Sequence, residues 1–368
     1  MALSHDADPN VSRHSLNFDE FYEVDLNYTD FFNYTDFHVN RNTIPCQSIS
    51  MSEVINITVC VFYAVVFLLA IPGNLIVGFV IGSNRQSLSP SEVYLFHLMA
   101  ADLLLALILP FYATSVVHGW LFGDTMCKLV SLVKEASFYT SILFLVCISM
   151  DRYMVIVWAM EARKAQRRLC SWAVCVAVWF LGILLSLPAL YNEAFSLKPS
   201  EPQICAERFE TDSSDEWRLA TRVMRHLLGF FLPLAVMITC YSITIARLLR
   251  TRGFQRQKAM RVIVAVVVAF LLCWTPFHMA TIVDTLMRAK LLENDCTKRN
   301  IVDVAMFATQ SLGLLHCCVN PVLYAFVGEK FRKKFKQLLY KSGMLERGSV
   351  SRSTRSSSQS SEAMSNFL

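Results

Sequence analysis

The sequence predicts an all-α membrane protein, a bundle of seven transmembrane helices followed by a short amphipathic helix. Hydrophobic residues make up 54% of the 368 residues and charged residues only 17%, whereas soluble proteins carry about a quarter. The apolar residues form long blocks, and a helix needs about 20 of them to cross a ~30 Å bilayer core. A large soluble helical core fits poorly, because soluble helices carry polar stripes that these blocks mostly lack.

Seven apolar blocks reach or nearly reach this length. The second contains Asp102, the third is charged near both ends, and the last four lack Asp, Glu, Lys and Arg. The blocks are Ile55–Ile81, Val93–Val117, Cys127–Val157, Leu169–Leu190, Leu227–Ala246, Val262–Val283 and Val304–Val327. We therefore divide the chain into a tail over 1–50, a seven-helix domain over 51–328, an amphipathic helix over 329–341 and a final segment over 342–368.

The basic residues predict the orientation in the membrane. Lys and Arg gather in 163–168, 247–261 and 330–336, and segments of this kind face the cytoplasm. The N-terminal tail then lies outside, where its three glycosylation sequons at Asn10, Asn27 and Asn33 can be used. The first 45 residues lack an apolar stretch, so we expect the first helix to act as its own insertion signal.

The two tails have different compositions. The first 45 residues combine eight acidic residues with interleaved aromatic residues, and Tyr22, Tyr28 and Tyr34 lie among the acids. A solvated disordered tail is one interpretation. The aromatic residues favour a second, a surface that captures a basic protein and carries sulfated tyrosines. Residues 349–368 are rich in Ser with interspersed basic residues, as expected of a cytoplasmic phosphorylation substrate.

The twelve cysteines fall into two groups. Eight lie within or at the edges of the apolar blocks, where we expect small buried hydrophobic side chains. The other four, Cys46, Cys127, Cys205 and Cys296, lie at predicted outer positions and indicate two disulfides. Three pairings of these four are open.

Asp102 is a charged residue inside a predicted transmembrane helix, where charge is costly and usually functional. Together with Asn74, Ser141 and Asn320 it predicts a cluster of oxygen donors that suits Na⁺ or water. A purely structural hydrogen-bond network is the alternative.

A further set of residues predicts a conformational switch. Asp151, Arg152 and Tyr153 end the third block, and an arginine at that depth needs a partner, which Asp151 can supply at rest. Three later blocks contain a proline, which removes a backbone hydrogen bond and can act as a hinge. These prolines and the side chains paired with them are Pro233, Pro276, Pro321, Trp274, Asn320 and Tyr324.

These elements, in this order and spacing, resemble the rhodopsin-like family of G-protein-coupled receptors over residues 46–341. The carrying residues are Gly73-Asn74, Leu98 to Asp102, Asp151 to Tyr153, Trp179, Pro233 with Tyr241, Cys273 to Pro276, and Asn320 to Tyr324. Residues 328–332 resemble the short amphipathic helix of that family. The resemblance implies a plasma-membrane receptor without enzyme activity, in which Arg152 and Tyr241 meet a G protein after the sixth helix moves outward.

Within this family the chain is similar to chemokine receptors. The carrying features are the four outer cysteines, the acidic tyrosine-bearing tail, Trp120 to Gly123, and His316 to Cys318. It resembles most the CXC type whose ligands carry a Glu-Leu-Arg motif, the interleukin-8 receptors. The residues that carry this are 257–263, 284–288, Lys134-Glu135, and Trp217-Arg218 with Arg222. Among the cysteine pairings we favour Cys127–Cys205 and Cys46–Cys296.

The resemblance also implies ligands and partners. A CXC chemokine would be captured by the tail and would insert its N-terminus near Lys134, Arg218, Arg222, Asp284 and Gln310. The receptor would then activate an inhibitory-type G protein and so drive calcium signalling and leukocyte (neutrophil) chemotaxis. Receptor kinases and arrestin would act on the serines, and membrane lipid would surround the bundle. No nucleic acid partner and no cofactor other than an allosteric Na⁺ is expected. A scavenging receptor and another peptide-activated receptor are the alternatives.

Three departures from the chemokine-receptor pattern qualify this expectation. Gln310 stands where these receptors usually carry Glu, Ile108-Leu109-Pro110 replaces Thr-x-Pro, and Met154-Val155 replaces Leu-Ala. In addition, Arg256 stands where some receptors place an acid that pins Arg152. A transporter is disfavoured because no internal repeat is present, and an enzyme because no nucleophile–base pair is found.

Overall fold

The computed structural model describes residues 52–83, 88–158, 164–196, 202–208, 214–249, 254–289, 291–293, 295–327 and 329–341. Within these residues lie seven helical spans that are long and apolar enough to cross a membrane. The spans are Glu53–Gly82, Pro90–His118, Gly123–Val157, Leu169–Tyr191, Glu216–Arg247, Ile263–Arg288 and Cys296–Tyr324. A further helix follows the seventh span, so the predicted fold is confirmed.

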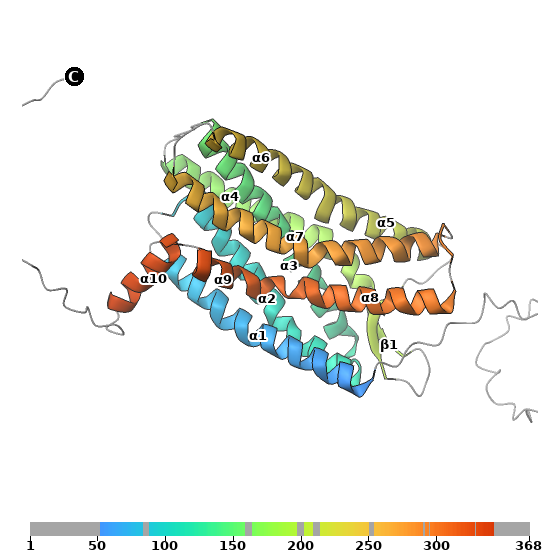
Figure 1. Cartoon of the computed structure of the whole chain (residues 1–368). Coiled ribbons are helices and arrows are strands. Elements are labelled where there is room, and N and C mark those ends of the chain that lie inside the picture. The colour runs from blue at the N-terminus through green and yellow to red at the C-terminus, as the bar shows by residue number, and fades with distance from the viewer. Residues whose placement is uncertain are drawn as a thin grey trace, which may run out of the picture. The chain divides into compact units, whose positions relative to one another are not determined.

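The helices lie side by side in one bundle, and α10 leaves it beyond α9 (Figure 1). The α-helices are α1 (Glu53–Gly82), α2 (Pro90–His118), α3 (Gly123–Val157), α4 (Lys164–Ser186), α5 (Ser214–His226), α6 (Leu232–Leu249), α7 (Phe254–Arg288), α8 (Cys296–Leu314), α9 (His316–Val327) and α10 (Glu329–Lys341). A 3₁₀ turn, η5 (Leu187–Tyr191), follows α4, and a π-helical turn, η6 (Leu227–Phe231), joins α5 to α6.

The two ends of the bundle differ. One end bears an antiparallel hairpin of β1 (Asn192–Phe195) and β2 (Ile204–Glu207), and Figure 1 places it near the starts of α5 and α8. We call this the hairpin end. The opposite end, where α3 finishes with Asp151, Arg152 and Tyr153, is called the Asp-Arg-Tyr end.

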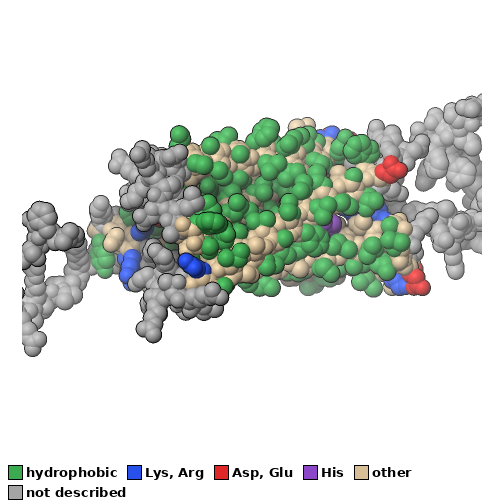
Figure 2. Space-filling model, turned by 90° about the horizontal axis from the view of Figure 1, so that it is seen from above, with side chains coloured by type: hydrophobic (Ala, Val, Ile, Leu, Met, Phe, Trp, Pro, Cys, Tyr) green, Lys and Arg blue, Asp and Glu red, His purple; other side chains and the backbone are tan. Residues whose placement is uncertain are grey.

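The outer surface of the bundle is apolar where a bilayer would touch it. Figure 2 shows hydrophobic side chains across the middle of one face, with charged side chains toward its two ends. Large side chains that would be buried in a soluble protein are exposed here, among them Phe79, Val176, Phe180 and Leu272. Apolar patches of this extent are unfavourable in water and favourable in lipid.

The polar residues of the membrane-spanning helices lie mostly inside the bundle. Asn74, Asp102, Ser141 and Asn320 are all buried, as the cost of polar groups in lipid requires. Not every cysteine follows the expectation of burial, since Cys170 on α4 is exposed. A thiol is apolar enough to face lipid, so burial was not required at that position.

The fifth and seventh spans extend beyond their predicted blocks at the hairpin end. The fifth begins at Glu216 rather than Leu227, and the seventh at Cys296 rather than Val304. The added turns contain charged residues, and for this reason the hydropathy pattern left these turns out of the predicted blocks. Ion pairs described below hold several of these charges, so the helices continue past the apolar blocks.

The prolines have different effects on their helices. Pro233 lacks the N–H that would bond to the Gly229 carbonyl, and Gly229 lies within the π-helical turn η6. α7 continues through Pro276, and α9 contains Pro321 within it. The seventh span is instead broken between α8 and α9, at Leu315.

Candidate functional site

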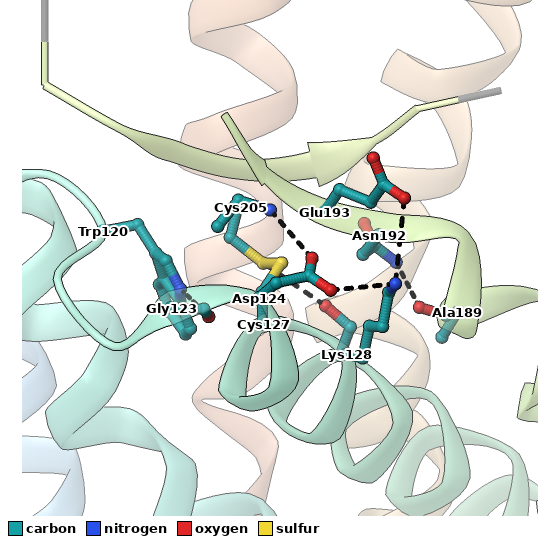
Figure 3. The surroundings of a disulfide bond; sticks show 11 residues. Trp120, Gly123, Asp124, Cys127, Lys128, Ala189, Asn192, Glu193 and Cys205 are labelled. Carbon is teal, nitrogen blue, oxygen red and sulfur yellow. Dashed lines mark hydrogen bonds and ion pairs between the residues drawn. A yellow bond between two sulfur atoms is a disulfide. The ribbon is translucent and has the colours of Figure 1, made fainter. Parts of the chain in front are cut away.

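A disulfide between Cys127 on α3 and Cys205 on β2 anchors the hairpin, so this predicted pairing is confirmed (Figure 3). The Asp124 carboxylate accepts a hydrogen bond from the Ala194 N–H at 3.3 Å. Lys128 lies between Asp124 at 2.9 Å and Glu193 of β1 at 3.7 Å. α3 and the hairpin are therefore joined by one covalent bond and several polar contacts.

Trp120 supports this arrangement from the loop between α2 and α3. It is buried, its indole N–H donates to the Gly123 carbonyl at 2.8 Å, and its backbone N–H donates to the Gln203 carbonyl at 2.6 Å. The neighbouring Gly119 has a φ of +76°, and a Cβ there would lie 2.6 Å from Cβ of Pro202. A residue with a side chain at 119 would be strained and would collide with the segment just before β2.

Cys296 at the start of α8 is also disulfide-bonded. Its predicted partner, Cys46, lies outside the described residues, as do the predicted tail sites Tyr22, Tyr28, Tyr34, Asn10, Asn27 and Asn33. Asp295 caps α8 by accepting a hydrogen bond from the Lys298 backbone N–H at 2.8 Å. This backbone hydrogen bond holds the pKa of the Asp295 carboxyl below its usual value.

A pocket lies between α3, α5, α7 and α8 toward the hairpin end. The space there that no atom fills amounts to about 280 Å³ when the open solvent at the mouth of the pocket is included. The lining residues are Lys134, Glu135, Phe138, Arg225, Trp274, Phe277 and Gln310. Two predicted ligand contacts, Lys134 and Gln310, therefore line the same pocket as the predicted switch residue Trp274.

Arg225 and Glu135 form the main ion pair of this pocket. Arg225 Nε donates to Glu135 Oε2 at 3.1 Å, and a terminal guanidinium nitrogen lies 3.1 Å from Oε1. Lys134 Nζ lies 3.6 Å from the same Oε1, and Arg225 lies 3.9 Å from Glu207 on β2. The pair joins α3 to α5, and Arg225 also extends the network to the hairpin.

The functional reading of the sequence missed Arg225. A signal was available, because Arg218, Arg222 and Arg225 recur at spacings of four and three residues, as on one face of a helix. Charged residues at such spacing just before an apolar block indicate that the helix continues outward.

Asp284 on α7 is the centre of a second charged cluster. Its side chain is fully buried, and Oδ2 accepts hydrogen bonds from Arg222 on α5 at 2.6 Å and Arg288 at 2.9 Å. Arg299 on α8 lies 3.9 Å from Oδ1 and 3.5 Å from Asp303. Arg222 and Asp284, both predicted as ligand contacts, thus bind each other.

Arg218, the remaining predicted contact of this group, lies one turn before Arg222 on α5 and is partly buried. The cluster around Asp284 contains three guanidinium groups for two carboxylates, so it carries an excess of positive charge. Such an excess at the mouth of a bundle attracts anionic groups.

Trp274 connects the pocket to the interior of the bundle. Its ring packs on Phe138 with centroids 4.7 Å apart, and its indole N–H donates to His316 Nδ1 at 3.2 Å. Gly313 allows this packing, because a Cβ there would lie 2.8 Å from a Trp274 ring carbon. Movement of Trp274 therefore requires a response from α8 or His316.

His316 extends this connection to Asp102. Its Nε2 lies 3.5 Å from Asp102 Oδ1, while Asn320 Nδ2 donates to Asp102 Oδ2 at 2.7 Å. His316 Nδ1 also lies 2.7 Å from the Gly313 carbonyl oxygen. The indole N–H of Trp274 requires this nitrogen to accept a hydrogen bond, whereas the Gly313 carbonyl requires it to donate one. The sequence analysis named His316 only among the residues that carry the family resemblance. Its position beside Asp102 was not predicted.

The four residues predicted to hold Na⁺ are only partly brought together by direct contacts. Asn320 bonds to Asp102, whereas the Asn74 amide donates to the carbonyls of Ala70 and Cys317. Asp102 Oδ1, Ser141 Oγ and Asn74 Oδ1 have no hydrogen-bond partner among the described residues. These buried oxygens fit a hard cation or water, and a ring nitrogen of His316 faces the same carboxylate oxygen.

At the Asp-Arg-Tyr end, Ser91 of α2 bridges Asp151 and Arg152. The Arg152 guanidinium donates to the Ser91 hydroxyl, which donates to Asp151 Oδ2 at 2.5 Å. The direct Arg152–Asp151 distance is 3.7 Å. Asp151 and Arg152 thus lie within ion-pair distance, and Ser91, which the sequence analysis did not single out, bonds to both.

Three tyrosines among the predicted switch residues differ in their contacts. The hydroxyl of Tyr241 on α6 hydrogen bonds to that of Ser149 on α3 at 2.8 Å. Tyr324 on α9 is buried, and its hydroxyl has no partner among the described residues. Tyr153 is half-buried, and the side chain of Arg256 lies outside the described part of the chain.

The base of α2 also binds α10. Glu92 forms a capping box with Ser89, and its other oxygen accepts a hydrogen bond from Lys334 of α10 at 2.8 Å. This contact fixes the amphipathic helix against the bundle near Ser91.

Comparison with known proteins agrees with this geometry. Residues 73–324 match the family described as 7 transmembrane receptor (rhodopsin family). The chain is 42% identical over 316 residues to C-X-C chemokine receptor type 1 of Oryctolagus cuniculus. The aligned residues cover 85% of this chain and 88% of that relative. The chain is 41% identical over 313 residues to C-X-C chemokine receptor type 2 of Homo sapiens, covering 85% and 86%.

A further relative matches nearly the whole length. It is C-X-C chemokine receptor type 2 of Mus musculus, 40% identical over 350 residues, with 95% of this chain and 96% of the relative covered. The seven spans and these relatives indicate a multi-pass protein of the plasma membrane that is a receptor and not an enzyme. The chain belongs to the rhodopsin family of seven-transmembrane receptors and, within it, to the group of the C-X-C chemokine receptors.

Proposed function

We propose that this chain binds CXC chemokines of the Glu-Leu-Arg group and activates an inhibitory-type heterotrimeric G protein. The observation that carries the proposal is a continuous series of contacts from the pocket into the bundle. Trp274 lines the pocket, hydrogen bonds to His316, and reaches Asp102 through it. The names of the relatives support the ligand class.

The hairpin end faces outside in this proposal, and the Asp-Arg-Tyr end faces the cytoplasm. The distribution of basic residues and the disulfide of the hairpin support this orientation. The acidic tail, with sulfated tyrosines and glycosylated asparagines, captures the basic chemokine. The chemokine N-terminus then enters the pocket.

Binding biases an equilibrium between two arrangements of the helices. The contacts of Arg152 with Ser91 and of Ser91 with Asp151 support our assignment of this structure to the resting arrangement. In the active arrangement α7, which contains the sixth membrane span, moves outward. Arg152 and Tyr241 then contact the G protein. Because the coupling is reciprocal, a bound G protein tightens chemokine binding.

Na⁺ and phosphorylation regulate this equilibrium in our proposal. Na⁺ near Asp102, Ser141, Asn74 and Asn320 stabilises the resting arrangement. Serines between 349 and 361, modified by receptor kinases, recruit arrestin through added negative charge. Calcium release and leukocyte chemotaxis are the expected cellular responses.

The test measures inhibition of cyclic AMP and release of calcium in cells that express the chain, against a panel of CXC chemokines. We expect a response to the Glu-Leu-Arg group that pertussis toxin abolishes. Cells that express an Arg152→Ala variant are the control, because they retain the pocket but lose the coupling residue. Chemokine uptake without signalling from the wild type would identify a scavenging receptor, and no binding of any chemokine would contradict the ligand assignment.

A further inference from the structure

Two buried histidines face each other between the fifth and sixth membrane spans. His226 ends α5 directly before the π-helical turn η6, and His278 lies on α7, two residues after Pro276. The two residues are 8% and 1% exposed, and their Nδ1 atoms lie 2.9 Å apart. This contact links α5 to α7 inside the bundle, and the proposed function gives it no role.

The hydrogen bonding of the two rings leaves their protons free to move. A neutral imidazole has one N–H and one lone pair, so in this contact one Nδ1 donates and the other accepts. The Nε2 atoms of His226 and His278 have no hydrogen-bond partner among the described residues. Both rings can therefore carry their proton on Nε2 and direct two Nδ1 lone pairs into the space between them.

Two imidazole lone pairs directed at one point match the requirements of a transition-metal dication. Neutral imidazole binds Zn²⁺ at distances of about 2.0–2.1 Å, and two nitrogens of a tetrahedral zinc site lie about 3.3 Å apart. The Nδ1 atoms of His226 and His278, 2.9 Å apart, need to separate by only about 0.4 Å to reach this spacing. Phe230 stacks on His278 with centroids 4.4 Å apart, and a ring face favours the positive charge that a bound metal gives an imidazole.

The pocket described above lies beside the histidine pair. It is lined by Arg225 and Phe277, the chain neighbours of His226 and His278. It is also lined by Phe138, whose ring centroid lies 5.8 Å from that of His278. The pocket thus supplies a route from the hairpin end for an ion and for the water molecules that would complete its coordination.

The charged groups near the pair largely neutralise one another. Nitrogens of Arg225 lie 3.1 Å from both oxygens of Glu135, and Arg222 lies 2.6 Å from Asp284. Lys134, at 3.6 Å from Glu135, brings the sum of these five groups to one excess positive charge. This excess weakens the binding of a dication, so we expect the site to fill only at raised metal concentrations.

We propose that His226 and His278 form a binding site for a transition-metal dication such as Zn²⁺, and that the bound ion fastens α5 to α7. Both Nδ1 atoms bind the ion, and water from the pocket completes its coordination. The site itself does not depend on the proposed function, whereas its effect on signalling does.

The position of the pair determines this effect. His278 lies one turn after Trp274, and Pro276 lies between them. An ion bonded to both helices stabilises only the arrangement in which the two Nδ1 atoms are close, and a ligand shifts an equilibrium by its differential affinity for the two states. The structure seen here is assigned to rest, so Zn²⁺ opposes the outward movement of α7 and lowers the response to chemokine.

Thermal unfolding of the purified full-length receptor in detergent, without chemokine, tests the site. Zn²⁺ at about tenfold above its Kd is expected to raise the melting temperature by about 2–4 °C, and Mg²⁺, which prefers oxygen ligands, should not. His226→Asn and His278→Asn should lose the shift, because asparagine keeps a polar atom near the Nδ1 position but lacks the imidazole. His118→Asn, which removes an exposed histidine at the end of α2, is the matched control and should keep it.

A wild-type shift that persists in both His226→Asn and His278→Asn would overturn the proposal, as would the absence of any shift. If one of these variants does not fold, the other decides, because each lacks one of the two ligands. Crystals of the wild type grown with Zn²⁺ locate the ion without any variant, through anomalous X-ray scattering at the zinc edge. A peak between the two Nδ1 atoms supports the site, and no peak there contradicts it.

The effect on signalling is measured as chemokine potency in cells with and without added Zn²⁺. Potency should fall several-fold on the wild type and on His118→Asn, and should not change on His226→Asn or His278→Asn. An unchanged potency on the wild type, at a Zn²⁺ concentration that raises its melting temperature, would contradict the regulatory role. A wild type that responds to no chemokine would remove the proposed function, and the unfolding experiment would still decide the metal site.

Discussion

The amide nitrogen of Asn74 on α1 donates a hydrogen bond of 2.8 Å to the backbone carbonyl of Cys317 on α9. Cys317 is four residues before Pro321, so its carbonyl is the one that the proline leaves without a helical N–H partner. A Cβ at Gly73 would lie 2.9 Å from Cβ of Pro321, so the two helices are close enough for this contact. Asn74 therefore repairs the hydrogen bonding of a proline-containing helix from a neighbouring helix.

Asn74→Ala is expected to destabilise the receptor by about 1–3 kcal/mol, because the buried carbonyl of Cys317 would lose its partner. Thermal unfolding of the purified receptor in detergent measures this effect. Thr58→Val is the control, since Thr58 also lies on α1 but is exposed, and among the described residues its hydroxyl bonds to Val54 of its own helix. An Asn74→Ala variant as stable as the wild type would show that the Cys317 carbonyl finds another partner.

The fold could be predicted from the sequence because its signals are local. A run of about 20 apolar residues determines a transmembrane helix without knowledge of its neighbours, and all seven spans were predicted. The ends of the helices were predicted less well where polar residues continue the helix. Arg222 is an example, because its charge is bound by Asp284 on another helix. Hydropathy cannot detect that pairing.

The site could be predicted only where single residues carry the signal. Trp274, Asp102 and Arg152 stand out by type and position, but their partners depend on how helices are rotated against one another. His316 beside Asp102 and Ser91 beside Arg152 are contacts across 214 and 61 positions of the chain. A serine or a histidine carries no distinctive signal in the sequence, so these partners could be identified only from the structure.

Gly313→Ala is expected to raise basal G-protein activation. The added Cβ would lie 2.8 Å from the Trp274 ring, which destabilises the arrangement seen here by about 1–3 kcal/mol. Cyclic AMP measured without agonist reports the change. Gly82→Ala is the matched control, because a Cβ at Gly82 has no atom within 4 Å. Unchanged basal activity of Gly313→Ala would show that Trp274 can shift without affecting the equilibrium.

Na⁺ is expected to lower agonist affinity if it binds near Asp102 in the resting arrangement. Radioligand binding in NaCl should be several-fold weaker than in choline chloride of equal ionic strength. Asp102→Asn should abolish the difference, because the carboxylate of Asp102 is the charged member of the predicted set and its Oδ1 has no hydrogen-bond partner among the described residues. Equal affinities in both salts for the wild type would indicate that His316, 3.5 Å from that oxygen, excludes the ion.

Ser91→Ala is expected to raise basal signalling about tenfold or more. The variant removes the hydroxyl that accepts from Arg152 and donates to Asp151, and hydrogen bonds to charged groups contribute about 1.5–3 kcal/mol each. Within the part of the chain that the structure describes, Arg152 would then be held only by Asp151 at a distance of 3.7 Å. Ligand-free nucleotide exchange on a purified inhibitory G protein measures the release of Arg152.

Ser91→Thr is the control for this prediction, because threonine keeps the hydroxyl and should keep basal exchange near the wild-type rate. Ser89→Ala, which removes the cap of the same helix, separates loss of the bridge from general damage to α2. If Ser89→Ala raises basal exchange as much as Ser91→Ala does, the effect arises from the helix terminus. If only Ser91→Ala does so, the hydroxyl between Asp151 and Arg152 keeps the receptor at rest.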